Sequence, residues 1–155
     1  MKITDTRIVE ENLFRFLIQL EIMRAIRYQN YVTLLLMEPD QGVEDNSKLT
    51  DLAEILHEEI RGTDIIGRLD RTRFGAILLH ADLKSAYLAS ARIHSRTKDY
   101  FSGNNNGFTI SIGGACCPSN STDSGALSML AESMLAIARE KGGNSISFPN
   151  GKESA

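Results

Sequence analysis

The sequence predicts an α/β domain in which helices flank a central mixed β-sheet of about five strands. Helical apolar spacings alternate along the chain with short runs rich in leucine and β-branched residues. The order is helix, strand, helix, strand, strand, helix, strand, helix, strand, which favours a mixed sheet. No linker or repeat divides the chain, so we expect one domain over 1–155 with an ordered core from about 6 to 149.

The first half alternates helix and strand. A helix is predicted over about 8–28, with its apolar face at Ile8, Leu13, Phe16, Leu17, Leu20, Met23 and Ile26. The run 31–37 predicts a buried strand that stops near Pro39, because proline donates no ladder hydrogen bond. A second helix over 49–60 has Asn46 or Ser47 as its cap, and the apolar runs 65–69 and 74–79 predict a hairpin.

The second half repeats the alternation. A helix over 82–100 carries Arg92 and Arg96 on the side opposite its apolar residues. A strand over 108–117 is predicted to stop at Pro118, with a strand-end kink at Gly113-Gly114. A helix over 123–141 ends at Gly142-Gly143, and a last short strand covers 145–148.

Composition excludes several classes. A net charge of -3 argues against a non-specific nucleic-acid binder. No apolar stretch is long enough to span a bilayer, and the first residues lack a signal-peptide core, so we expect a cytoplasmic domain without a membrane segment. Cys116 and Cys117 are adjacent, which disfavours a disulfide, and the scattered histidines predict no metal site.

Three strings carry a resemblance to a known family. TDIIGRLDRTRFGAILL (63–79), FTISIGGACCPSNS (108–121) and LAESMLAIAREKGGNSI (130–146) follow one another in a family's order and spacing. They resemble the GGDEF domain, the diguanylate cyclase family of bacterial signalling. The resemblance covers nearly the whole chain and implies a nucleotidyl-cyclase-like sheet flanked by helices.

The signature turn departs from the family. Asp70, Arg71, Thr72, Arg73 and Phe74 stand where the family has Gly-Gly-Asp-Glu-Phe. The family's glycines let the hairpin approach a nucleotide, and its acidic pair serves metal binding and catalysis. Thr72 is a poor substitute for a carboxylate, and the cation of Arg73 would oppose Mg²⁺.

Other active-site positions are also altered. Glu38 stands where the family has a metal carboxylate, but the segment that follows it is shorter than the family's guanine-recognition segment. The family's phosphate-binding lysine and arginine align with Arg139 and Gly143. The resemblance therefore implies an inactive enzyme without catalytic residues or cofactor.

A second family motif is kept. Arg61 and Asp64 match R-x-x-D, the family's inhibitory site for cyclic di-GMP, and Arg92 aligns with a frequent third contributor. Arg96, one helical turn later, is a weaker candidate. Arginine can bind a guanine edge or a phosphate, and aspartate can accept from guanine. The alternative is structural: Arg61 would compensate a helix dipole, and Asp64 would pair with a surface cation.

Three functions follow from the resemblance. The first is an inactive receptor that binds cyclic di-GMP as a regulatory ligand, similar to regulators of exopolysaccharide export and biofilm formation. The second is a ligand-free interaction or dimerisation module, whose partners would be a neighbouring domain, a protein of a signalling or secretion system, or a second copy. The third, residual action on GTP, would depend on Glu38 and Asp70.

Overall fold

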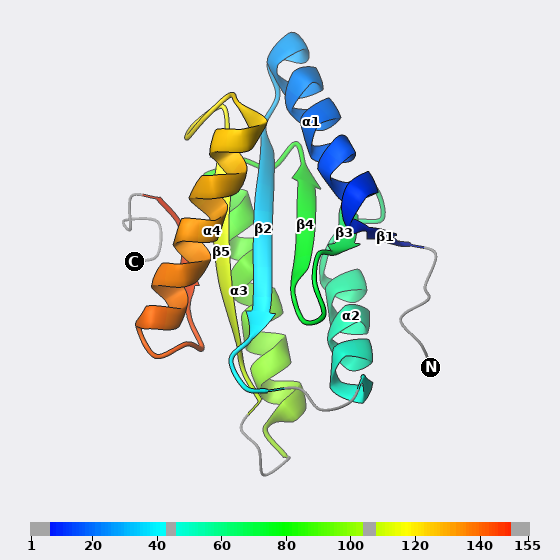
Figure 1. The fold of residues 1–155 in the computed structure, drawn as a ribbon, viewed down its shortest axis with the longest axis vertical. Helices are drawn as coiled ribbons and strands as arrows, with labels where there is room; N and C mark the ends of the chain where they lie inside the picture. Colours follow the sequence, from blue (N-terminus) through cyan, green and yellow to red (C-terminus); the bar gives the residue numbers. More distant parts are fainter. Residues whose placement is uncertain (1–6, 43–45, 104–107, 150–155) are drawn as a thin grey trace.

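A six-stranded sheet with a pair of helices on each face forms the domain (Figure 1). The computed structural model describes residues 7–42, 46–103 and 108–149. The elements are β1 (Ile8–Glu10), α1 (Glu11–Tyr28), β2 (Val32–Pro39), α2 (Ser47–Glu59), β3 (Ile65–Arg68), β4 (Phe74–Leu79), α3 (Leu83–Phe101), β5 (Ile110–Cys117), α4 (Ser124–Glu140) and β6 (Ile146–Ser147).

The strands lie in the order β1-β3-β4-β2-β5-β6. The four central strands pair antiparallel, and the short edge strands β1 and β6 are parallel to their neighbours. This confirms the predicted mixed sheet and the hairpin of β3 and β4. The expected number of strands was one too low, because Ile8–Glu10 pairs with β3 as β1 instead of beginning the first helix.

Each face of the sheet has its own apolar core. Leu34 and Leu36 of β2 pack with α1 and α4, whereas Leu35 and Met37 pack with α2 and α3. This follows from the alternation of side chains along a strand. Figure 1 shows the helix pairs α1/α4 and α2/α3 on opposite sides of the sheet. A central strand that is covered on both faces needs apolar residues throughout, which explains the continuous apolar run predicted over 31–37.

Polar caps fix the ends of the helices. The carboxylates of Glu10, Asp82 and Asp123 accept backbone N–H groups at the starts of α1, α3 and α4. The hydrogen bond from the Ser85 amide lowers the pKa of Asp82. After α4 the backbone of Gly142 has a φ of 103°, which explains the predicted stop there.

The buried face of α1 differs from the predicted one. Phe14, Ile18, Ile22 and Ala25 pack on the sheet, while Leu13, Phe16, Met23 and Ile26 are exposed. The ring of Phe14 lies over the paired glycines of β3 and β4: a Cβ on Gly67 would come within 2.4 Å of it. These glycines leave space for one aromatic ring, and the contact selects the face of α1.

β2 extends further than predicted, and β5 lacks the predicted kink. β2 includes Pro39, which pairs with Ile110 of β5 but lies beyond the last pair with β4. Its missing N–H therefore interrupts no bond to β4. β5 runs through Gly113 and Gly114 to Cys117 without a kink, because the glycines are needed for packing rather than for a bend.

Across the described ranges, no helix is long and apolar enough to cross a membrane.

We expect Gly113→Ala to lower the free energy of unfolding by about 3 kcal/mol, because overpacking against a backbone cannot be relieved by a rotamer change. The new Cβ would lie 2.2 Å from the Leu135 nitrogen and 2.7 Å from the Ala131 oxygen of α4. Urea denaturation measures this loss. The control is Gly103→Ala, where no atom lies within 4 Å. Equal stabilities of the two variants would contradict the proposed close packing of α4 on β5.

Candidate functional site

The R-x-x-D residues lie where α2 ends and β3 begins. The Asp64 carboxylate accepts the backbone N–H of Arg61 at 3.1 Å and that of Leu79 at 2.9 Å. Its side chain is only 3% exposed, whereas that of Arg61 is 63% exposed. Asp64 therefore fixes the turn and the end of β4, and Arg61 remains accessible to a ligand.

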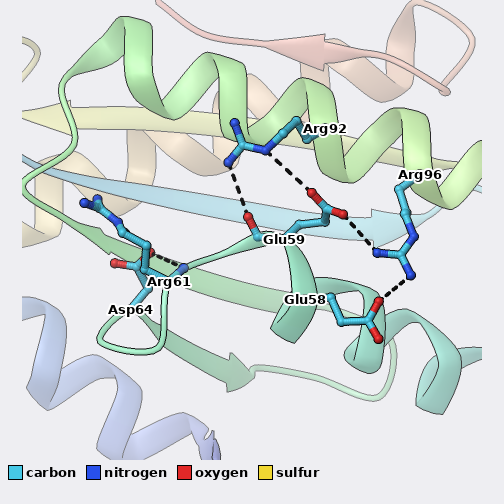
Figure 2. Close-up of polar contacts among 6 residues, drawn as sticks. All are labelled: Glu58, Glu59, Arg61, Asp64, Arg92 and Arg96. Atoms are coloured by element: carbon cyan, nitrogen blue, oxygen red, sulfur yellow. Dashed lines mark hydrogen bonds and ion pairs between the residues drawn. The ribbon is translucent and has the colours of Figure 1, made fainter.

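Arg61 and Asp64 both hold the same residue of β4. Arg61 donates from Nη2 to the carbonyl oxygen of Leu79 at 2.7 Å, while Asp64 receives the Leu79 amide. The guanidinium Nε lies 3.7 Å from the Asp64 carboxylate (Figure 2). The Leu79 carbonyl oxygen and the Asp64 carboxylate thus position Arg61 together. Its remaining N–H donors can bind a ligand, because the side chain is largely exposed.

The α3 arginines meet the end of α2. Arg92 lies 3.5 Å from the Glu59 carboxylate and donates to the Glu59 carbonyl oxygen at 3.3 Å. Arg96 pairs with Glu59 at 2.9 Å and also with Glu58. Figure 2 shows Arg92 reaching from α3 to Glu59, and Arg96 reaching to both Glu58 and Glu59. The hydrogen bonds with Glu58 and Glu59 raise the pKa of Arg96.

A pocket of about 300 Å³ brings Arg61, Asp64 and Arg92 together. Leu88 and Ala89 of α3 add an apolar wall. Arg96 is not among the lining residues, so the structure separates this weaker candidate from the other three. The volume is at the lower end of the range of about 300–1,000 Å³ for small-molecule sites.

Hydrogen bonds among its own residues hold the β3–β4 turn in place. Arg68 donates from Nε to the carbonyl oxygens of Asp70 at 3.1 Å and Arg71 at 3.2 Å, and the Asp70 carboxylate accepts the Arg71 amide at 2.7 Å. Burial, followed by the nearby charge of Arg71, lowers the pKa of Arg68. These contacts explain a glycine-free turn that contains two arginines and an aspartate: its polar groups satisfy one another.

The carboxylate of Glu38 is occupied by cations. Arg139 of α4 lies 2.8 Å from Glu38 Oε1, Arg73 lies 3.3 Å from the same oxygen, and Thr72 donates to Oε2 at 3.3 Å. No group of three or more histidine, cysteine, aspartate or glutamate side chains suited to a metal occurs within the described residues. The site therefore combines one carboxylate with two guanidinium groups.

Asp40 is an organising residue that sequence reasoning missed. Its carboxylate accepts hydrogen bonds from the hydroxyls of Thr109 and Ser111 and from the backbone N–H of Asn144. A Cβ on Gly143 would lie 2.6 Å from that carboxylate, so this glycine is needed for close approach. The partners lie far along the chain, and the only available signal was an aspartate directly after a buried strand.

Comparison with known proteins identifies the class. Residues 44–145 match the family model described as diguanylate cyclase, GGDEF domain. The uncharacterized protein YhcK of Bacillus subtilis (strain 168) is 33% identical over 114 residues, which cover 71% of this chain and 32% of that protein. The chain therefore belongs to the GGDEF family, and it spans about a third of the length of this curated relative.

Solved structures share the fold at low identity. The active GGEEF domain of a diguanylate cyclase from Vibrio cholerae superimposes with a TM-score of 0.82 at 16% identity, covering 91% of this chain and 97% of that one. The GGDEF domain of DgcB from Caulobacter crescentus, solved in complex with c-di-GMP, gives 0.78 at 14% identity, covering 91% of both chains. SiaD from Pseudomonas aeruginosa, solved with its activator SiaC, gives 0.78 at 17% identity over 90% of this chain and 58% of that one.

We expect Asp64→Ala to lower the free energy of unfolding by about 2 kcal/mol, because the backbone N–H groups of Arg61 and Leu79 lose their acceptor. Arg61→Ala should cost less than about 1 kcal/mol, because its side chain is largely solvent-exposed. Thermal or urea unfolding of both variants tests this difference. A larger loss for Arg61→Ala would contradict the division of roles between these two residues.

Proposed function

We propose that this GGDEF domain makes no cyclic di-GMP and instead binds it as a regulatory ligand at Arg61, Asp64 and Arg92. The observation that carries the proposal is the pocket in which these three residues meet, with Arg61 exposed and held in place. In this proposal the domain works in the cytoplasm and transmits its bound state to a neighbouring domain or a protein partner, with control of exopolysaccharide export as the output.

The chemistry of the pocket suits a guanine nucleotide. The guanidinium of Arg61 offers a planar set of donors to guanine O6 and N7 or to a phosphate. Arg92 adds a second cation from the facing helix, and Leu88 offers an apolar surface for the base. The solved c-di-GMP complex of the DgcB domain supports this ligand class for the same fold.

The absence of synthesis is supported by the charges around Glu38. Phosphoryl transfer requires metal ions that neutralise the phosphates. Glu38 is the one carboxylate in the three-residue cluster with Arg73 and Arg139, and both arginines contact it. A divalent cation would have to displace these guanidinium groups and would then lie beside two positive charges.

A ligand-free interaction module is the second candidate. The contacts of Arg92 with Glu59 favour it, because this carboxylate competes with a phosphate for the same guanidinium. The exposed apolar face of α1 also favours it. Titration with the nucleotide separates the two candidates.

Isothermal titration should show micromolar binding of cyclic di-GMP, and Arg61→Ala or Arg92→Ala should raise the Kd by at least about tenfold, the usual cost of losing a charge-assisted contact. Arg15→Ala is the matched control, because its side chain is 62% exposed and its charge lies on α1 away from the pocket. Absence of heat with the folded wild-type chain would leave the interaction module as the function.

We also expect no cyclic di-GMP from GTP and Mg²⁺ when the products are separated by chromatography. The physical reason is that the Glu38 carboxylate is engaged by Arg73 and Arg139, which would repel Mg²⁺. The active domain from Vibrio cholerae serves as the positive control. Product formation by the wild-type chain that is lost in Glu38→Ala would contradict the proposed silence of the site.

A further inference from the structure

The outer face of α1 is unusually apolar for a surface helix. Leu13, Phe16, Met23 and Ile26 are between 42% and 66% exposed, although long apolar side chains are rarely grouped on a free surface. They lie on the side opposite to the residues that pack on the sheet, namely Phe14, Ile18, Ile22 and Ala25. The helix is therefore apolar on two faces, and only one of them is covered within the described chain.

The spacing of this face is that of a helix-pairing seam. Leu13, Phe16, Leu20 and Met23 are separated by three, four and three residues, the repeat that lets two helices interlock. Toward the end of α1, a groove of about 800 Å³ continues the face. Its apolar wall is made by Met23, Ile26 and Tyr31. The seam and the groove together form one continuous surface, called the α1 seam below.

The α1 seam is self-complementary. The residues Leu13, Phe16, Met23 and Ile26 are spaced by three, seven and three positions, so the pattern is the same in either direction along the helix. A two-fold axis near Gln19 and Leu20 would place Phe16 of one copy against Met23 of the other. Such symmetry is what an interface between identical subunits requires.

Charges at the helix ends select one orientation. Glu11 pairs with Arg15 at 2.6 Å, and Glu21 lies 3.8 Å from Arg24. Glu10 caps the helix and Glu11 lies in its first turn, so the beginning of the helix is acidic. Arg27 marks its end as basic. Antiparallel helices bring these opposite charges and the helix dipoles into favourable contact, whereas parallel helices would oppose like charges.

We propose that the α1 seam joins two copies of this chain through antiparallel packing of their α1 helices. The interface buries Phe16 and Met23 at its centre and brings Glu10 of each copy near Arg27 of the other. It needs no nucleotide, so it does not depend on the cyclic di-GMP binding proposed above.

Sedimentation equilibrium without nucleotide tests the association. The wild-type chain should form a concentration-dependent dimer, and Phe16→Glu or Met23→Glu should raise the dimer Kd by at least about tenfold, because a buried unpaired charge opposes association. Met129→Glu is the control, because Met129 is 70% exposed on α4. Circular dichroism and thermal unfolding show that the variants fold. A monomer at all concentrations, or a dimer unaffected by both α1 variants, would overturn the proposal.

Disulfide cross-linking tests the orientation. The native cysteines, Cys116 and Cys117, are fully buried, so a surface cysteine can be introduced into the wild-type chain. A mixture of Phe16→Cys and Met23→Cys chains should cross-link to each other in preference to either chain with itself. Preferential self-linking at both positions would indicate parallel helices, and cross-linking only to another protein would indicate a different occupant; either result contradicts the proposal.

Discussion

The position of β2 is the constraint on which the rest of the structure depends. This strand pairs antiparallel with β4 on one side and β5 on the other, and both of its faces are covered by helices. Because β2 is buried and paired on both sides, the residues at its two ends are held in fixed positions. At one end, Glu38 and Asp40 reach the β3–β4 turn and the segment after α4. At the other, Val32 pairs with Leu79, the residue held by Arg61 and Asp64. Both candidate sites are thus located by a single strand.

The two sites differ in how their charges are arranged. Around Glu38, two guanidinium groups face one partly buried carboxylate, so this cluster carries a net positive charge. In the R-x-x-D pocket, the buried Asp64 is satisfied by backbone N–H groups, which leaves Arg61 free to present its charge outward. The same sheet therefore holds one carboxylate engaged by two cations and, at its other end, an arginine that stays largely exposed.

The predictions succeeded where short-range pattern decides the structure. The hairpin, the buried strand and the stop after α4 depend on runs of apolar residues and on local backbone preferences. The buried face of α1 was wrong because two candidate apolar faces exist, and the choice between them was made by glycines in β3 and β4, about fifty residues away. The partners of Asp40 and the pairing of Arg92 with Glu59 are likewise long-range contacts that no local pattern encodes.

The contacts of Arg61 and Asp64 with Leu79 connect the R-x-x-D pocket to the end of β4. Leu79 ends β4, and the next residue, His80, has a left-handed backbone with a φ of 59° and lines both this pocket and the groove beside α1. An anion that attracts the guanidinium of Arg61 competes directly with the Leu79 carbonyl for its donor. The end of β4 is therefore a structural element that the pocket and the groove beside α1 have in common.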